Sequence, residues 1–481
     1  MIGGSIIAMV VALVLHDAFP DFPLAPGLDP RAVALAAVLP QGAIAMLLHA
    51  WVRRCAHRLD RTGRAVHLIR AERGISTSRA ASLAVHLIAV LWLGWPDAIR
   101  AGLGFDPILL DEAIALAPGV GALIGSWWSA SMIDRRLREA LVIRSLDEGS
   151  ALRPIPTRAG FVWEQVRHQL LFVLVPFGLI SAWMEAATIL VRRAVERWPA
   201  LDGPWGSALD AGAQLAGVVI VLALAPLLPR VLWDTVPLGP GPLRERLLRL
   251  CAEQRVRCGP LLVWRTHGGA LNGAMIGALP WFRSILLTDA LLEHLNEAQV
   301  EGVMAHEVAH ARRHHIPWLM AALLASVGGA WTIASLGSMA LRAVGAPGEG
   351  APGAVLLAAG AGMWALGFVS RRFEHQADAF AAQHLSGARP GGAPVPIRPE
   401  AAGAMSGALG EVAAMNAIPL DRFTHRHGSI LARQQHLASL VGEPSDRLPI
   451  DRTVRRIKWT IAVGVALVIV ASVLEALIGA G

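Results

Sequence analysis

The chain is poor in charged residues and in cysteine, and it contains no tyrosine. Charged residues make up 16% of its 481 residues and hydrophobic residues 54%, which is too apolar for an ordinary soluble protein of this length. The three cysteines, Cys55, Cys251 and Cys258, are too few for a disulfide framework or a four-thiolate zinc site, and they demand no oxidising compartment. This composition indicates an integral membrane protein.

Lysine is nearly absent as well, because Lys458 is the only one in a chain of formal net charge +7. The arginines form short blocks between apolar runs, without a basic face and interleaved aromatics, so nucleic acid is not an expected partner. Membrane orientation explains these blocks better, since short cytoplasmic loops collect positive charge. The preference for arginine over lysine suggests a GC-rich bacterial genome.

Long apolar runs recur along the chain, and about 20 helical residues suffice to cross a bilayer core of roughly 30 Å. A shorter run at residues 2 to 16 is expected to be a ninth span. The eight longer spans are expected near residues 32 to 51, 80 to 97, 107 to 133, 169 to 191, 211 to 229, 316 to 341, 353 to 370 and 457 to 479.

The distribution of arginine predicts the orientation of these spans. Eight arginines between Arg53 and Arg79 form the expected loop between the second and third spans, whereas residues 17 to 30 contain three aspartates and no Lys or Arg. The first segment is therefore expected in the cytoplasm and the second outside. The same count places residues 230 to 315 and 371 to 456 in the cytoplasm, although the arginines from 192 to 197 do not fit it.

The last two of these segments form the expected soluble domain. An amphipathic helix is expected at residues 241 to 256, strands at 261 to 266 and 283 to 288, and a helix from about Asn296. Residues 345 to 353 are expected to be an external turn and residues 386 to 403, rich in Gly and Pro, a mobile loop.

The predicted fold class is mostly α, a polytopic transmembrane helical protein with a small cytosolic α+β domain. The expected parts are a multi-span membrane region (1–235), the first part of the soluble domain (236–315), a transmembrane hairpin (316–370), the second part of the soluble domain (371–456) and a C-terminal span (457–481).

Residues 306 to 310 read His-Glu-Val-Ala-His within a strongly helical segment. On a helix His306 and His310 share a face, so both imidazoles can reach one metal ion, while Glu307 flanks a water molecule beside it. The motif is short and needs a third ligand. It predicts a zinc hydrolase.

Glu374 and Asp378 are also four residues apart, directly after an expected span. Glu374 can ligate zinc, and Asp378 can support a ligand imidazole from behind. The alternative is a solvated helix face that balances Arg371 and Arg372. The upstream motif favours the metal site.

Several segments of the chain, in the same order, resemble the integral-membrane zinc endopeptidases that include the heat-shock protease HtpX and the CAAX prenyl endopeptidases. The resemblance runs from about Leu243 to Leu440. It implies a gluzincin-like domain that binds one Zn²⁺ per chain through His306, His310 and Glu374, with Glu307 as the general base. The matching segments are Asn272-Gly-Ala, residues 285 to 292, residues 300 to 310, Glu374 with Asp378, and His427-Gly-Ser-Ile with Arg433.

Two further site residues are predicted. A tetrahedral oxyanion needs another donor, and because the chain lacks tyrosine, His427 is the expected catalytic group, although Gly428 replaces the Pro often found next in the family. The alternative for His427 is a surface residue in a basic stretch with His425 and Arg426. Asn272 resembles the family's Asn near the edge strand and could hold the substrate backbone or simply form a turn. His314 and His315 are expected to anchor at lipid headgroups.

The resemblance implies an endopeptidase that hydrolyses membrane-associated or misfolded proteins at the cytoplasmic surface of a bacterial inner membrane. Its expected partners are the lipid bilayer and protein or peptide substrates, and the sequence leaves the oligomeric state open. Two other functions are compatible with the motifs: a sensor-transducer metalloprotease of the antibiotic-receptor type, and a non-catalytic membrane zinc protein.

Overall fold

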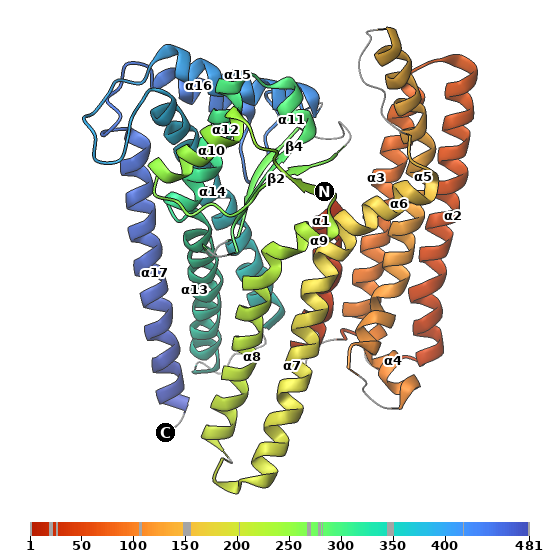
Figure 1. Ribbon diagram of the computed structural model, residues 1–481. Helices are drawn as coiled ribbons and strands as arrows, with labels where there is room; N and C mark the ends of the chain where they lie inside the picture. The colour runs from red at the N-terminus through yellow and green to blue at the C-terminus, as the bar shows by residue number, and fades with distance from the viewer. Residues whose placement is uncertain are drawn as a thin grey trace. The chain divides into compact units, whose positions relative to one another are not determined.

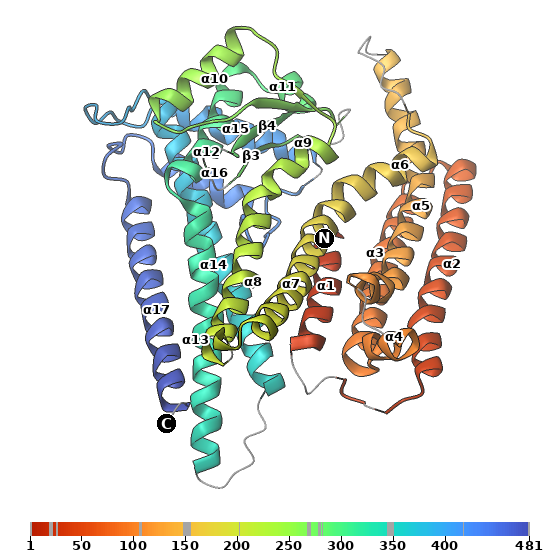
Figure 2. The ribbon, with the colours of Figure 1, turned by 60° about the horizontal axis from the view of Figure 1, so that its bottom comes forward.

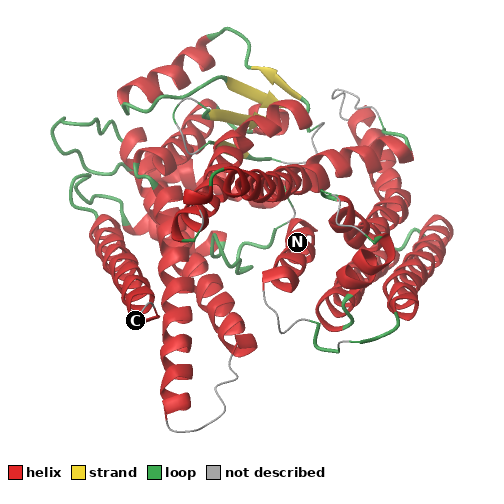
Figure 3. Ribbon diagram, turned by 90° about the horizontal axis from the view of Figure 1, so that it is seen from below, coloured by secondary structure: helices red, strands yellow, loops and turns green. Residues whose placement is uncertain are grey.

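The computed structural model describes all residues except 1, 19–22, 26, 105–107, 148–154, 202, 267–270, 278–279, 281, 344–350, 417 and 480–481. The described chain is mostly helical and forms two compact units, Met1–Trp233 and Asp234–Gly481 (Figure 1). A small four-stranded sheet lies in the second unit (Figure 3). The predicted fold class is confirmed in its helical, membrane-spanning character and its small α+β part.

Five helices in the described residues are long and apolar enough to cross a membrane, and two shorter apolar helices run Gly4–Asp17 and Trp205–Val221. The expected spans at 353–370 and 457–479 lie within α14 (Ala351–Leu385) and α17 (Pro449–Gly479). The expected external turn lies mostly outside the described residues. The five long helices are Pro30–Thr62, Val66–Trp92, Leu110–Ala140, Arg158–Arg197 and His315–Ser338.

The predicted arginine-rich loop between residues 53 and 79 is wrong. Helix α2 (Pro30–Thr62) continues through the first arginines, and α3 (Val66–Leu87) begins after a turn of three residues. Gly63, at φ +63°, closes α2 by donating its N–H to the Leu59 carbonyl. Arginine is a good helix former, so both helices outlast their apolar stretches, and the span expected at 80–97 begins at Val66 instead.

In the first unit, α2, α3 and α5 pack side by side (Figures 1 and 2). Asp29 caps α2 by accepting the Ala32 N–H, and Thr157 caps α6 by accepting the Gly160 N–H. The other helices of this unit are α1 (Ile2–Ala18), α4 (Trp95–Leu103), α5 (Leu110–Asp147), α6 (Arg158–Gln165), α7 (Leu171–Arg197), α8 (Pro204–Leu224) and α9 (Leu228–Leu232).

The sheet of the second unit has the strand order β1-β2-β4-β3. β2 and β4 pair in parallel, and the two other pairs are antiparallel. β4 is buried along its whole length, whereas β3 forms an edge. The two predicted strands are confirmed as β2 and β4. The four strands are β1 (Thr235–Pro237), β2 (Leu261–Trp264), β3 (Gly273–Ile276) and β4 (Ser284–Thr288).

Helices surround this sheet, and α13, α14 and α17 extend together away from it (Figure 2). The hydrophobic core of the unit joins β4, α12 and α14. The two predicted helices are confirmed as α10 and α12. The remaining helices are α10 (Pro242–Glu253), α11 (Asp289–His294), α12 (Glu297–Arg312), α13 (His315–Ala343), α15 (Pro399–Met415) and α16 (Ile430–Ser439).

The loop predicted at residues 386–403 lacks helix as far as Arg398, as predicted, but its last residues do not belong to a loop. Residues from Pro399 onward belong to α15, and the preceding segment is tied to the chain before α17. The Ser445 N–H donates to the Val395 carbonyl, the Val395 N–H donates to the Ser445 hydroxyl, and Ile397 is buried. This pairing provides hydrogen-bond partners for backbone groups of Val395 and Ile397 in a Gly- and Pro-rich segment.

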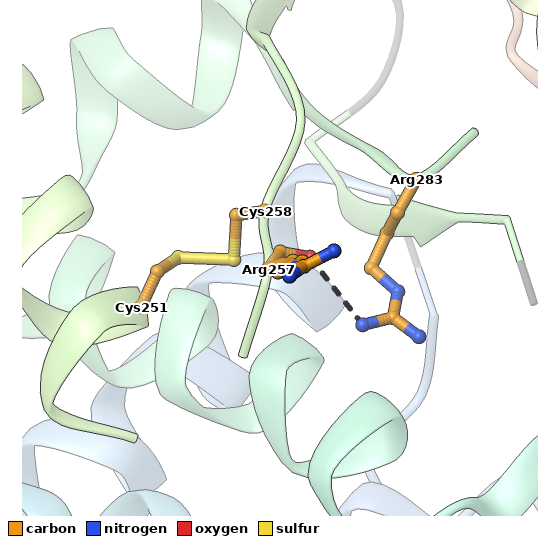
Figure 4. The surroundings of a disulfide bond; sticks show 4 residues. All are labelled: Cys251, Arg257, Cys258 and Arg283. Atoms are coloured by element: carbon orange, nitrogen blue, oxygen red, sulfur yellow. Dashed lines mark hydrogen bonds between the residues drawn. A yellow bond between two sulfur atoms is a disulfide. The ribbon is translucent and has the colours of Figure 1, made fainter. Parts of the chain in front are cut away.

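Cys251 and Cys258 form a disulfide between the end of α10 and the chain that enters β2 (Figure 4). In the same view the Arg283 guanidinium points to the carbonyl of Arg257, with Nη1 3.4 Å from the oxygen. Cys55 is free and buried. The chain thus has one disulfide, which the sequence analysis did not expect, and no disulfide framework.

Candidate metalloprotease site

Helix α12 carries the His-Glu-Val-Ala-His motif and begins with a capping box. The Gln299 N–H donates to the Asn296 side chain, and the Gln299 side chain accepts the Asn296 N–H, both at 3.0 Å. Gly302 lets α14 approach, because a Cβ atom there would lie 3.3 Å from Leu385 Cδ1. These contacts fix which face of α12 is turned toward α14.

The three predicted metal ligands lie together between α12 and α14. The Nε2 atoms of His306 and His310 are 3.2 Å apart. Glu374 places one oxygen 3.6 Å from His306 Nε2 and the other 3.9 Å from His310 Nε2. One ligand atom of each residue lies within 4.8 Å of the other two. A single cation could therefore contact all three side chains.

Asp378 orients the His306 ring. Its Oδ1 lies 2.9 Å from His306 Nδ1, and the Nε2 atom of the same ring faces Glu374 and His310. Arg433 holds this carboxylate with two contacts, Nε to Oδ2 at 2.8 Å and Nη2 to Oδ1 at 2.6 Å. Burial raises the pKa of Asp378, but Arg433 and His306 outweigh it and hold that pKa far below its ordinary range.

A longer chain of side chains orients His310. Gln376 donates its amide N–H to Asp451 and accepts the Nε2 proton of His315 at 2.9 Å, so His315 Nδ1 is an acceptor. His310 Nδ1, 2.9 Å away, must then be the donor, and its Nε2 is bare. Burial lowers the pKa of His310 to about 4, so its ring is neutral at neutral pH.

The role predicted for His315 is therefore wrong. It is fully buried and stacks on Phe373 with ring centroids 4.3 Å apart, so it does not reach lipid headgroups. The exposed His314 before it has φ +55°, a left-handed conformation that turns the chain between α12 and α13. This turn places the His315 ring against His310, which regular helical spacing does not predict.

Glu307 lies beneath the edge strand of the sheet. Its Oε2 accepts the Met275 N–H at 2.9 Å. β3 can approach α12 this closely because residue 273 is glycine, where a Cβ atom would lie 2.7 Å from Val303 Cγ1. Burial raises the pKa of the Glu307 carboxyl above its ordinary value. A carboxylate of raised basicity thus lies next to the two histidines.

The structure also brings His427 to the cluster. Its Nδ1 lies 3.0 Å from Glu374 Oε1, and its side chain is 52% exposed. Thr424 and Gly428 form a tight turn around it, and Gly428 has φ +74°, which proline cannot adopt. The absence of the proline often found in the family therefore follows from the local backbone.

Arg433, one of the residues that carry the family resemblance, has no role that the sequence alone predicts. Besides holding Asp378, Arg433 places Nη1 3.2 Å from Glu374 Oε2. Burial raises the pKa of Glu374, yet His427, Arg433 and the two histidines hold it well below its ordinary value. Arg433 thus stabilises the ionised forms of both acidic groups.

Asn272, the predicted substrate-binding residue, lies exposed immediately before β3. Its N–H donates to the Thr288 hydroxyl, and its carbonyl accepts the Thr288 N–H, both at 3.0 Å. Asn272 therefore lies just before the edge strand, and both its backbone N–H and its carbonyl are hydrogen-bonded to Thr288.

The arrangement fits a divalent cation. The Nε2 atoms of His306 and His310 face each other at 3.2 Å beside an ionised carboxylate, so a cation that takes the place of the shared proton could accept a lone pair from each ring. Two imidazoles and one carboxylate are a donor set that zinc adopts in catalytic sites, where it keeps a further position open.

Residues 263–418 match the model of peptidase family M48, and this segment contains the motif helix and Glu374. The comparison with curated protein sequences finds no match. The crystal structure of S. mikatae Ste24p is similar to the chain, with 13% sequence identity, a TM-score of 0.43, and coverage of 86% of this chain and 99% of that one. This segment is thus similar to peptidase family M48, and the chain is a metalloprotease with helices long and apolar enough to span a membrane.

Proposed function

We propose that the chain is a zinc-dependent endopeptidase that hydrolyses membrane-associated or misfolded proteins at the cytoplasmic surface of a bacterial inner membrane. The observation that carries this proposal is the convergence of His306, His310 and Glu374, with Glu307 beside them under an open sheet edge. The M48 family match supports the peptidase activity.

The residues divide the chemistry among themselves. Zinc held by His306, His310 and Glu374 would supply a Lewis acid for the scissile carbonyl and would acidify water. Glu307 takes a proton from the attacking water and passes it to the leaving amine. His427, in its protonated form, donates a hydrogen bond to the developing oxyanion.

The register of β3 indicates where a substrate strand would pair. The Asn272 carbonyl accepts the Thr288 N–H, so by the antiparallel alternation the backbone groups of Gly273 and Met275 point away from β4. The bond from the Met275 N–H to Glu307 agrees with this direction. A peptide added along this edge would run past Glu307, with main-chain bonds supplying most of the recognition.

The position of the site supports substrates delivered by the membrane. α13 begins at His315, and the apolar helix His315–Ser338 is long enough to span a bilayer. The turn at His314 brings the first residue of this helix, His315, against His310, with their Nδ1 atoms 2.9 Å apart. The cleaved bond would therefore lie within about two helix turns of the membrane surface.

The test compares one unfolded peptide in two forms, fused to a single apolar helix in the same vesicles as the enzyme, or free in solution. We expect faster cleavage of the tethered form, at internal bonds, and none by Glu307→Gln. Equal rates for the two forms would contradict membrane delivery, and release of terminal residues alone would contradict endopeptidase activity.

A further inference from the structure

A groove of about 1,260 Å³ lies between α2 and α5 of the first unit. A Cβ atom at Gly125 of α5 would lie 3.3 Å from Ala45 Cβ of α2, and His49 Nδ1 lies 3.3 Å from the Ser129 hydroxyl. The two helices are therefore parallel along the groove. One end of the groove is formed by the lower residue numbers of both helices, and the other end by the higher ones.

The two ends of the groove differ in chemistry. The end with the lower residue numbers is apolar, and the other end is cationic. The apolar end is lined by Ala45, Met46, Gly121, Ile124 and Gly125, with Trp128 farther along. The cationic end is lined by Arg53, Arg54, His57, Arg136 and Arg158.

The positive charge of the cationic end is mostly uncompensated. Asp60 is the one acidic residue among those lining the groove, and Arg136 contacts both of its oxygens at 2.6 Å. Arg53, Arg54 and Arg158 lie beyond ion-pair distance of every carboxylate in the described part of the chain. Three guanidinium groups therefore surround the end of the groove without a protein counter-ion.

The boundary between the two ends falls where a bilayer surface is expected. Residues 32–52 of α2 contain no Asp, Glu, Lys or Arg, and these 21 residues rise about 31 Å as a helix, close to the thickness of the hydrocarbon core. Arg53 and Arg54 follow at once. They therefore emerge at the level of the lipid phosphates, whichever side of the membrane that is.

We propose that this groove binds an anionic phospholipid, with its phosphate between Arg54 and Arg158 and an acyl chain along Met46 and Ile124. Basic pockets between membrane helices bind the head groups of anionic lipids, and the planar guanidinium matches two phosphate oxygens at once. A net negative head group adds attraction that a zwitterionic one lacks. The site is independent of the peptidase chemistry in the second unit.

The test is native mass spectrometry of the full-length protein, purified in detergent and titrated with phosphatidylglycerol or phosphatidylcholine. We expect one tightly held phosphatidylglycerol. Replacing both Arg54 and Arg158 by Gln should weaken its binding roughly 10- to 30-fold. The matched control, Arg58→Gln with Arg61→Gln, removes the same amount of charge from the end of α2, outside the groove, and should leave binding unchanged.

A second variant, Met46→Trp, fills the apolar end at a side chain that is 70% exposed, so it should weaken lipid binding without disturbing the core. Equal losses in the groove and control variants would mean that only overall charge acts, and would overturn the proposal. Equal binding of the two lipids, or displacement of phosphatidylglycerol by millimolar inorganic phosphate, would overturn it as well.

Discussion

His315 links a metal-facing histidine to the start of α17, through Gln376 and Asp451. His315→Phe would keep the packing against Phe373 but remove the acceptor that fixes the proton on His310 Nδ1. We expect zinc affinity to fall about 10- to 100-fold. Competition with a chromogenic chelator measures this. His314→Asn, which keeps the left-handed turn, is the control, and equal affinities of the two variants would remove His315 from the site.

His427 has a separable effect, because Arg433 also contacts Glu374 and would still hold it after His427 is removed. His427→Ala should lower kcat about 10²- to 10³-fold if the ring stabilises the oxyanion. Zinc content should stay at the wild-type level. Arg426→Ala, at the neighbouring position, should keep wild-type turnover. An unchanged kcat for His427→Ala would assign the residue to the surface.

The raised pKa of Glu307 predicts the acid limb of the pH profile. A general base acts only when ionised, so kcat/KM should fall as the pH drops through that pKa, which burial places above the ordinary 4.5. Zinc content measured at each pH separates this effect from protonation of the ligand histidines. A limb below pH 4.5 with zinc still bound would contradict the assignment.

Of the two side chains that contact the outer nitrogens of the metal-facing histidines, Asp378 and His315, only Asp378 could be predicted from the sequence. Asp378 could be predicted because it lies four residues from Glu374, on the same helical face. His315 could not, because the left-handed residue His314 interrupts the regular spacing before it. Arg433 was visible as a motif position, but only the folded chain shows that it binds two carboxylates.

At the scale of elements, α12, β2 and β4 follow from local pattern and capping residues, and their prediction succeeded. Two loops were mispredicted for different reasons. The arginines after residue 53 were taken as a loop because charge ends an apolar run, yet it does not end a helix. The segment 386–398 is ordered by pairing with residues 442–445, a contact that local composition cannot reveal.

The exposed residues 391–394 provide a test of the predicted membrane orientation. Ala393→Cys should be labelled by an impermeant maleimide only when the cytoplasmic face is accessible, because Cys251 and Cys258 are bonded and Cys55 is buried. The wild type is the background control. The arginine count supports this orientation, whereas disulfides persist mainly in oxidising compartments. Labelling from the outer face alone would reverse the predicted topology.

At the scale of the whole molecule, the sequence motifs belong to the second unit, and the first shows only apolar runs and arginine blocks. Apolar length and charge predicted a membrane region, but they do not predict which helices pack together or where a groove opens. The sheet edge beside Glu307 likewise depends on the strand order, which local pattern leaves undetermined.

The most direct test measures zinc content and cleavage of an unfolded protein substrate in the same detergent-purified preparations of wild type and Glu307→Gln. The account predicts about one zinc per chain in both proteins and cleavage by the wild type alone, because Glu307 is the base and not a ligand. Equal cleavage by both proteins, or loss of zinc from Glu307→Gln, would contradict it.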